Sequence, residues 1–130
     1  MSLTNHSIAD CDFTNADDLN AIGSLLNAYI GDEMGGGTPI SKLQQLRLVD
    51  ALNQHPTSIV LLAQTDDVYC GLLIAFENLS TFTVSSMINI HDLIVLSGFR
   101  GEGVGRKLLE ALVEKAERKN CSRVTLEVRD

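Results

Sequence analysis

The sequence predicts an α/β fold of the α+β type, in which helices flank a mixed, mostly antiparallel sheet. Two apolar segments, residues 58–64 and 68–76, meet at the pair Asp66 and Asp67, which is typical of a hairpin. Between the other strands, apolar residues recur at three- and four-residue steps, as they do in amphipathic helices. The last strand, helix and strand follow one another, which indicates a parallel pair. The predicted order is β-α-α-β-β-β-α-β.

The first half of the chain predicts one strand and two helices. Residues 7–13 alternate weakly between apolar and polar side chains, as strands do. Asn15 is placed to cap the first helix. The apolar stripe of this helix consists of Leu19, Ile22, Leu26 and Tyr29. Glycines at 35–37 interrupt it, and Thr38 with Pro39 is expected to begin a second helix that ends at residues 53–56.

The second half predicts the remaining strands. Gly71, inside the strand at residues 68–76, indicates a bulge or a close approach of another element. A strong apolar strand follows at residues 87–96. The final strand runs from Val124 to Val128, with alternate apolar side chains on one face.

A helix is expected between these last two strands. Glycines at 101, 103 and 105 precede it, and Asn120 supplies a left-handed stop. The apolar row of this helix consists of Val104, Leu108 and Leu112.

The composition is that of one ordinary folded domain spanning residues 1–130. Of its residues, 45% are hydrophobic and 21% charged. The formal net charge of −7 argues against a nucleic-acid surface, which needs clustered Lys and Arg. No apolar run reaches the ~18 residues that span a bilayer, and no signal-peptide pattern is present, so a cytoplasmic protein is expected. The spacing of Cys11, Cys70 and Cys121 predicts neither a disulfide framework nor a metal site.

One segment has a pattern typical of ligand binding, namely Arg-Gly-Glu-Gly-Val-Gly at residues 100–105. Glycines allow tight turns, and the first amides of a helix lack intrahelical acceptors, so such a place binds phosphate or pyrophosphate. The Rossmann and P-loop patterns both fail, because Arg106 and Val104 stand where they need Gly and Lys. The pattern that fits is Arg or Gln, two residues, Gly, one residue, then Gly or Ala. It is met by Arg100, Gly103 and Gly105.

The segment at residues 88–105 resembles the central motif of the GNAT superfamily of N-acetyltransferases. The likeness rests on the strand Ile-Asn-Ile-His-Asp-Leu-Ile-Val, the connection Leu-Ser-Gly-Phe and the glycine pattern that follows. The next helix, Cys121 and residues 125–130 extend it, and the order of elements is similar from residue 7 onward. Ser97 is a departure, because many members have proline there; this changes the stiffness of the loop.

The resemblance implies acetyl-coenzyme A as co-substrate and no metal. Backbone groups at the end of the strand at 87–95 would pair with the pantetheine arm, and the amides of the glycine loop would hold the pyrophosphate. The acetyl carbonyl would lie where this strand and the one at 124–128 splay apart, and an amine would attack the thioester directly. The expected cofactor-binding residues are Leu93, Ile94, Val95, Arg100, Gly101, Glu102, Gly103, Val104, Gly105 and Arg106.

His91 is the candidate general base. An alkyl ammonium must lose a proton before it attacks, and an imidazole can accept that proton directly or through water. Strand alternation predicts that positions 89, 91, 93 and 95 share one face, with Asp92, interpreted as structural, on the other. The alternative for His91 is a structural role, hydrogen-bonded to backbone at a strand bulge. His6 and His55 lie in expected loops and receive no role.

Two carboxylates border the expected acceptor side. Asp32 and Glu33 precede the glycines at 35–37, and in the family the connection between the first two helices lines the acceptor site. These side chains either attract an acceptor ammonium or belong to a solvated loop.

The resemblance also implies a further segment after Asp130. Family members continue with a helix and two strands, and a tyrosine on that helix can protonate the leaving thiolate; Tyr29 and Tyr69 do not match it. A C-terminally truncated domain is therefore expected. Its strand from Val124 to Val128 would have an exposed edge, which predicts a homodimer or a strand borrowed from another chain.

The predicted function is transfer of an acetyl group from acetyl-coenzyme A to a primary amine on a small molecule, a peptide or a protein. The alternative is a coenzyme A-binding module of the same fold without turnover, because the general acid would lie in the absent segment. The intact glycine pattern disfavours a fragment with a degraded site. The sequence does not identify the acceptor.

Overall fold

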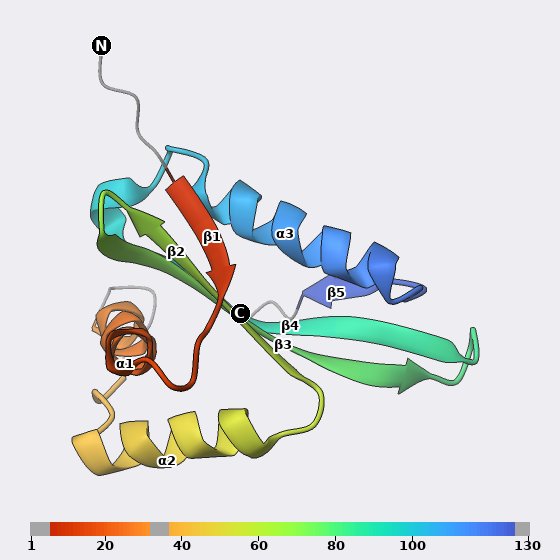
Figure 1. Ribbon diagram of the computed structural model, residues 1–130, viewed down its shortest axis with the longest axis horizontal. Helices are drawn as coiled ribbons and strands as arrows, with labels where there is room; N and C mark the ends of the chain where they lie inside the picture. Colours follow the sequence, from red (N-terminus) through yellow and green to blue (C-terminus); the bar gives the residue numbers. More distant parts are fainter. Residues whose placement is uncertain (1–5, 32–36, 127–130) are drawn as a thin grey trace.

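The computed structural model describes residues 6–31 and 37–126 and forms one five-stranded sheet between two helical layers (Figure 1). The strands are β1 (His6–Asp10), β2 (Ser58–Thr65), β3 (Val68–Ser80), β4 (Ser85–Val95) and β5 (Val124–Leu126). The helices are α1 (Ala16–Ile30), α2 (Lys42–Gln54) and α3 (Val104–Arg118), with a 3-10 turn, η1 (Ser97–Phe99). Neighbouring strands follow the chain order and are antiparallel, except for the parallel pair β4 and β5. These findings confirm the predicted fold class.

Helices pack on both faces of the sheet. Strand side chains alternate in direction, so each face presents apolar side chains that a helical layer buries. α3 packs on one face, and α1 with α2 packs on the other (Figure 1). The predicted apolar row of α3 is confirmed, since it is almost completely buried; its members are Val104, Leu108 and Leu112. The opposite layer centres on Ile22, Leu25, Leu62, Leu72 and Ile94.

Side-chain caps determine where the first two helices begin. The side chain of Asn15 accepts hydrogen bonds from the amides of residues 17 and 18, as expected for a cap. The predicted start of α2 at Thr38 and Pro39 is wrong, because Ser41 is its cap and exchanges hydrogen bonds with Gln44. Upstream of this cap, Asn27 of α1 bonds both the amide and the carbonyl of Ile40. That contact holds the segment outside the helix.

Several strand boundaries differ from those predicted. β1 ends at Asp10, before residue 13, because the chain then turns toward the cap of α1. β3 continues past residue 76 to Ser80, and β4 begins before residue 87, at Ser85. These two serines pair with each other. Backbone pairing continues through the polar residues of this hairpin, and the side-chain pattern alone does not predict that extension.

The pairing of β3 with β4 contains a bulge. Ile74 pairs with Asp92, and Ala75 pairs with Ile90. His91 is therefore the extra residue of β4, opposite no single partner.

Gly71 lies where β3 passes close to α3. The register between β2 and β3 shifts beside it. A Cβ at this position would lie 2.9 Å from Val104 Cγ1, 3.0 Å from Leu108 Cδ1 and 3.1 Å from Ala63 Cβ. Both parts of the sequence expectation, a bulge and a close approach, are confirmed.

Gly71→Ala is expected to lower the free energy of unfolding by about 1–3 kcal/mol, because the added methyl overpacks the sheet against α3. Gly98→Ala is the matched control, since a Cβ there would meet no atom within 4 Å, and it should change the unfolding free energy by less than about 0.5 kcal/mol. Urea unfolding measures both values. Equal stability of the two variants would contradict the close approach.

A hydrogen bond links α1 to the sheet. The hydroxyl of Tyr69 on β3 donates to a carboxylate oxygen of Asp18 in the first turn of α1. This bond, with burial and the charge of Asp18, raises the pKa of Tyr69 to about 12. The other carboxylate oxygen of Asp18 accepts from the amide of Asp12 at 2.8 Å.

Tyr69→Phe is expected to lower the unfolding free energy by about 1 kcal/mol at pH 8. Because the pKa of Tyr69 is raised on folding, the stabilisation is complete below about pH 10 and is lost as the pH rises toward 12. Urea unfolding of parent and variant at pH 8 and pH 11 should therefore show a difference that shrinks at the higher pH. A difference that stays constant would argue against this hydrogen bond.

Candidate active site

The connection between β4 and α3 presents backbone amides to solvent. Gly101 and Gly103 have φ values of 84° and 87°, which glycine adopts without strain. Gly103 is the N-cap of α3. Among residues 6–31 and 37–126, no side chain caps this helix, and a Cβ at either glycine would meet no atom within 4 Å. The amides of the first turn lack intrahelical acceptors and lie at the positive end of the helix dipole. The loop therefore fits a pyrophosphate group.

Charged side chains flank this loop. Nε of Arg100 donates to the carbonyl of Val95 at 3.2 Å, so the side chain reaches back to the end of β4. Arg106 is exposed in the first turn of α3, and Gly105 lies between it and the buried Val104. Burial of Val104 fixes the start of α3 on the sheet, while its neighbours remain accessible.

The end of β4 lies beside the glycine loop. Leu93, Ile94 and Val95 pair with β3 along one side. Along the other side, the described part of β5 pairs with β4 only at positions 88–90. Within the described residues, the strand end therefore keeps an open edge. A cavity of about 50 Å³ adjoins it, lined by Ala28, Tyr29, Ile94, Val95, Leu96, Ser97 and Arg100.

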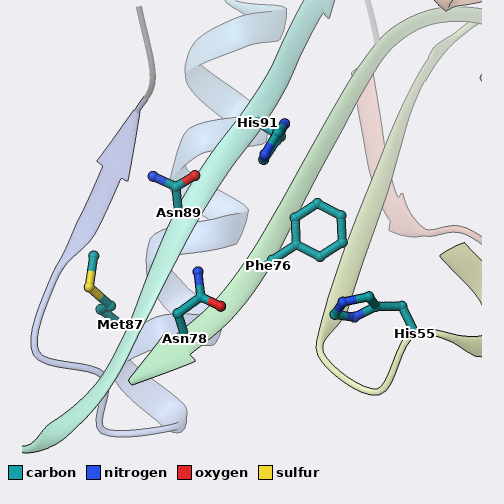
Figure 2. Close-up of a pocket in the computed structure, with 6 residues that line it drawn as sticks. All are labelled: His55, Phe76, Asn78, Met87, Asn89 and His91. Carbon is teal, nitrogen blue, oxygen red and sulfur yellow. The ribbon is translucent and has the colours of Figure 1, made fainter. Parts of the chain in front are cut away.

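A larger pocket, of about 470 Å³, opens over β3 and β4 near the end of α2 (Figure 2). Its lining residues are His55, Phe76, Asn78, Met87, Asn89 and His91. The ring of Phe76 lies between two imidazoles, with its centroid 4.8 Å from that of His55 and 5.4 Å from that of His91, both edge-to-face. Asn89 also donates to Thr125 Oγ1 of β5 at 2.7 Å. The pocket thus joins the predicted base to residues of β3 and of the turn after α2.

The bulge in β4 changes which side chains share a face. Asn89 and His91 line the pocket, whereas Leu93 and Val95 pack in the layer under α3. The expectation that positions 89, 91, 93 and 95 share one face is therefore wrong, because the extra residue shifts the alternation by one.

The same shift affects Asp92. It takes the face of Ile94, on the side of α1 and α2, and so does not oppose His91 as expected. His91 itself is exposed. Within residues 6–31 and 37–126, its ring contacts Phe76 and makes no hydrogen bond. The imidazole is thus accessible from the pocket.

The sequence analysis missed most of this pocket. It assigned no role to His55 and did not single out Phe76, Asn78, Met87 or Asn89. Alternation across a β3–β4 hairpin places positions 76, 78, 87 and 89 on one face, and that signal was available. No local sequence pattern indicated His55. Its place in the pocket depends on the turn after α2, which brings it to the strands.

Two further expectations involve residues outside the described ranges. The first concerns Asp32 and Glu33, expected beside the acceptor, and the second concerns positions 127 and 128 of the predicted final strand. The described part, Val124–Leu126, is the last strand of the sheet order. A homodimer through this edge stays a prediction.

The thiols are poor nucleophiles. Burial, together with nearby aspartates, raises the pKa of Cys11 to about 12. Burial also raises the pKa of Cys121, and Cys70 is completely buried. Because the thiolate is the reactive form, the raised pKa values disfavour Cys11 and Cys121 as nucleophiles, and burial keeps Cys70 from a substrate.

Two kinds of feature are absent from the described ranges. Residues 6–31 and 37–126 contain no cluster of three or more His, Cys, Asp or Glu side chains suited to holding a metal ion. None of the helices in that part of the chain has the length and apolar character to cross a membrane.

Comparison with known proteins connects this geometry to a family. Residues 25–130 match the model of the acetyltransferase (GNAT) family. An uncharacterized N-acetyltransferase from Archaeoglobus fulgidus is 39% identical over 62 residues, which cover 47% of this chain. The match spans 42% of that relative's length.

Solved structures share the fold at low sequence identity. A ribosomal-protein-alanine N-acetyltransferase from Brucella melitensis biovar Abortus has a TM-score of 0.77 and 21% identity, over 96% of this chain and 81% of that one. A GNAT family acetyltransferase from Staphylococcus aureus has a TM-score of 0.81 and 19% identity, over 96% and 87%. An aminoglycoside acetyltransferase from an uncultured soil metagenomic sample, in complex with sisomicin, has a TM-score of 0.78 and 18% identity, over 96% and 78%. The sequence match and the shared fold agree, and the chain belongs to the GNAT family of acetyltransferases.

Proposed function

We propose that this chain is an N-acetyltransferase that moves an acetyl group from acetyl-coenzyme A to a primary amine. The observation that carries the proposal is the start of α3, where Gly103 takes a left-handed conformation at the N-cap and no side chain of the described residues caps the helix. The amides that follow can donate to pyrophosphate oxygens, and the helix dipole favours their negative charge. Arg100 and Arg106 add positive charge beside them.

The open edge of β4 is suited to the rest of the cofactor. Backbone N–H and C=O groups at a strand edge need hydrogen-bond partners. The pantetheine arm is an extended chain with amide groups, so it can pair with the backbone of Leu93, Ile94 and Val95. The cofactor would then run from the glycine loop toward the bulge at His91.

We assign His91 as the general base. Its exposed ring lines the pocket and makes no hydrogen bond within the described residues, so its nitrogens are accessible to an acceptor. His91 takes a proton from the acceptor ammonium, which frees the nitrogen lone pair. When bound, acetyl-coenzyme A supplies a thioester carbonyl to that nitrogen. A C–N bond forms as the C–S bond breaks. The nitrogen loses a second proton, and the leaving thiolate takes up one proton to become the free thiol.

We assign the acceptor to the pocket around Phe76. Within residues 6–31 and 37–126, the residues that line it combine aromatic, thioether and amide groups with two imidazoles and include no carboxylate. Such walls favour an amine whose attached group is apolar or neutral and polar, because a multiply charged acceptor would lose hydration without gaining an ion pair. Amines on peptides and on small molecules both satisfy this description.

Calorimetry and a thiol-release assay test the proposal. Acetyl-coenzyme A should bind with micromolar affinity, and free thiol should form only when an amine is added. Peptides with an N-terminal alanine and simple alkyl amines are the expected acceptors, and sisomicin, which carries several ammonium groups, is the disfavoured comparison. Binding without thiol release for any amine would support the coenzyme A-binding module instead. Absence of binding would overturn both.

A further inference from the structure

His6 connects the first strand to the glycine loop. It begins β1, and its side chain is only 4% exposed. Its Nε2 lies 3.2 Å from the backbone carbonyl oxygen of Glu102, and its Nδ1 lies 2.5 Å from Oγ1 of Thr65 at the end of β2. Figure 1 shows the start of β1 beside the turn that precedes α3. A buried imidazole thus reaches the middle of an exposed loop.

The carbonyl of Glu102 determines the role of one ring nitrogen of His6. A carbonyl oxygen can only accept, so Nε2 carries the proton that is donated to Glu102. A second hydrogen bond joins Nδ1 to the hydroxyl of Thr65. The oxygen of Thr65 lies 3.2 Å from Sγ of Cys70 and can accept the thiol proton. Every donor in this series has an acceptor, and the series ends on the loop backbone.

Glu102 is the residue through which this contact acts on the loop. Its neighbours Gly101 and Gly103 both have positive φ, and a Cβ at either would meet no atom within 4 Å. Glycine backbone in open space samples many conformations. The contact from His6 restricts Glu102 and, through it, the direction in which the amides after Gly103 point.

We propose that His6 is a positioning residue for the cofactor, because its hydrogen bond to the Glu102 carbonyl holds the glycine loop in the conformation that binds the pyrophosphate of acetyl-coenzyme A. This inference rests on the proposed function of the loop. His6 contacts Thr65 and Glu102, and besides the Glu102 carbonyl its Nε2 lies 3.8 Å from Oε1 of the Glu102 side chain. Neither partner lines the pocket that contains His91. Loss of His6 should therefore weaken donor binding and leave the chemical step unchanged.

Two variants separate the two hydrogen bonds of the ring. His6→Asn places an amide near Nδ1 and keeps the contact with Thr65 but does not reach Glu102. His6→Gln places an amide N–H near Nε2 and can still donate to Glu102. We expect His6→Asn to raise the KM for acetyl-coenzyme A about tenfold, and His6→Gln to stay within about threefold of the parent chain.

Acetyl-pantetheine is the matched donor, because it has the same thioester without the pyrophosphate. Neither variant should change kcat/KM for this donor by more than about twofold, since its reaction does not depend on the glycine loop. An equal loss with both donors would indicate general damage to the fold and would overturn a positioning role.

A second measurement needs no coenzyme. Backbone amide order parameters of Glu102 and Gly103 are expected near about 0.85 in the parent and in His6→Gln, and to fall toward about 0.6 in His6→Asn. Unchanged order parameters in His6→Asn would overturn the proposal. A parent chain that binds no acetyl-coenzyme A would overturn the proposed function instead, and the order parameters would still decide whether His6 holds the loop.

Discussion

Gly103→Glu should weaken acetyl-coenzyme A binding by at least about 100-fold. Gly103 has a φ of 87° at the N-cap of α3, and a left-handed conformation costs other residues roughly 1–2 kcal/mol. The added carboxylate would enter the open space beside the first-turn amides. There it would compete for their hydrogen bonds and repel the phosphate charge. Calorimetric titration of parent and variant measures the loss.

Two controls separate charge from backbone strain. Gly103→Asn adds a neutral side chain that tolerates left-handed backbone, and its loss of affinity should stay below about tenfold. Gly98→Glu adds the same charge in η1, where a Cβ would meet no atom within 4 Å, and should also lose less than about tenfold. Unchanged binding by Gly103→Glu would show that the pyrophosphate does not bind at this loop.

His91→Gln should lower kcat for amine acetylation at pH 7 by about 10²- to 10⁴-fold, while affinity for acetyl-coenzyme A is retained. Glutamine fills similar space at the bulge but cannot accept a proton. The deficit should shrink as the pH rises toward the pKa of the amine, about 10 for an alkyl ammonium, because solvent then supplies the free base. A pH profile of kcat for both proteins measures this effect.

His55→Gln is the matched comparison for the second imidazole of the pocket. It removes the other ring that contacts Phe76 and leaves His91 in place. We expect a change of several-fold in the KM for the acceptor, with kcat within about threefold of the parent. If His91→Gln keeps the full kcat at neutral pH, then His91 has a structural role at the bulge and is not the general base.

The elements of this fold follow from local patterns in the sequence. The cap at Asn15 and the left-handed turn at Asp66 and Asp67, with φ values of 50° and 67°, both depend on neighbouring residues only. The same holds for Asn120, whose φ is 56° after α3. Such signals are readable because their hydrogen bonds span a few residues.

Features that depend on a distant partner were not predictable in this way. The start of α2 depends on Asn27 of α1, which bonds Ile40. The bulge at His91 depends on how β4 registers against Ile74 and Ala75 of β3. A period-2 pattern contains no information about an inserted residue, so the faces of Leu93 and Val95 were assigned wrongly.

By itself, the sequence determined the order of elements and the glycine loop, because periodicity, caps and glycines act over one or two turns. The tertiary structure alone decided which side chains surround the pocket at His91 and which side chain contacts the glycine loop. It brought His55 and Phe76 to His91 through strand register, and it joined His6 to Glu102 across 96 positions of the chain. The physical reason is that packing and buried hydrogen bonds select partners by position in space, which no local pattern encodes.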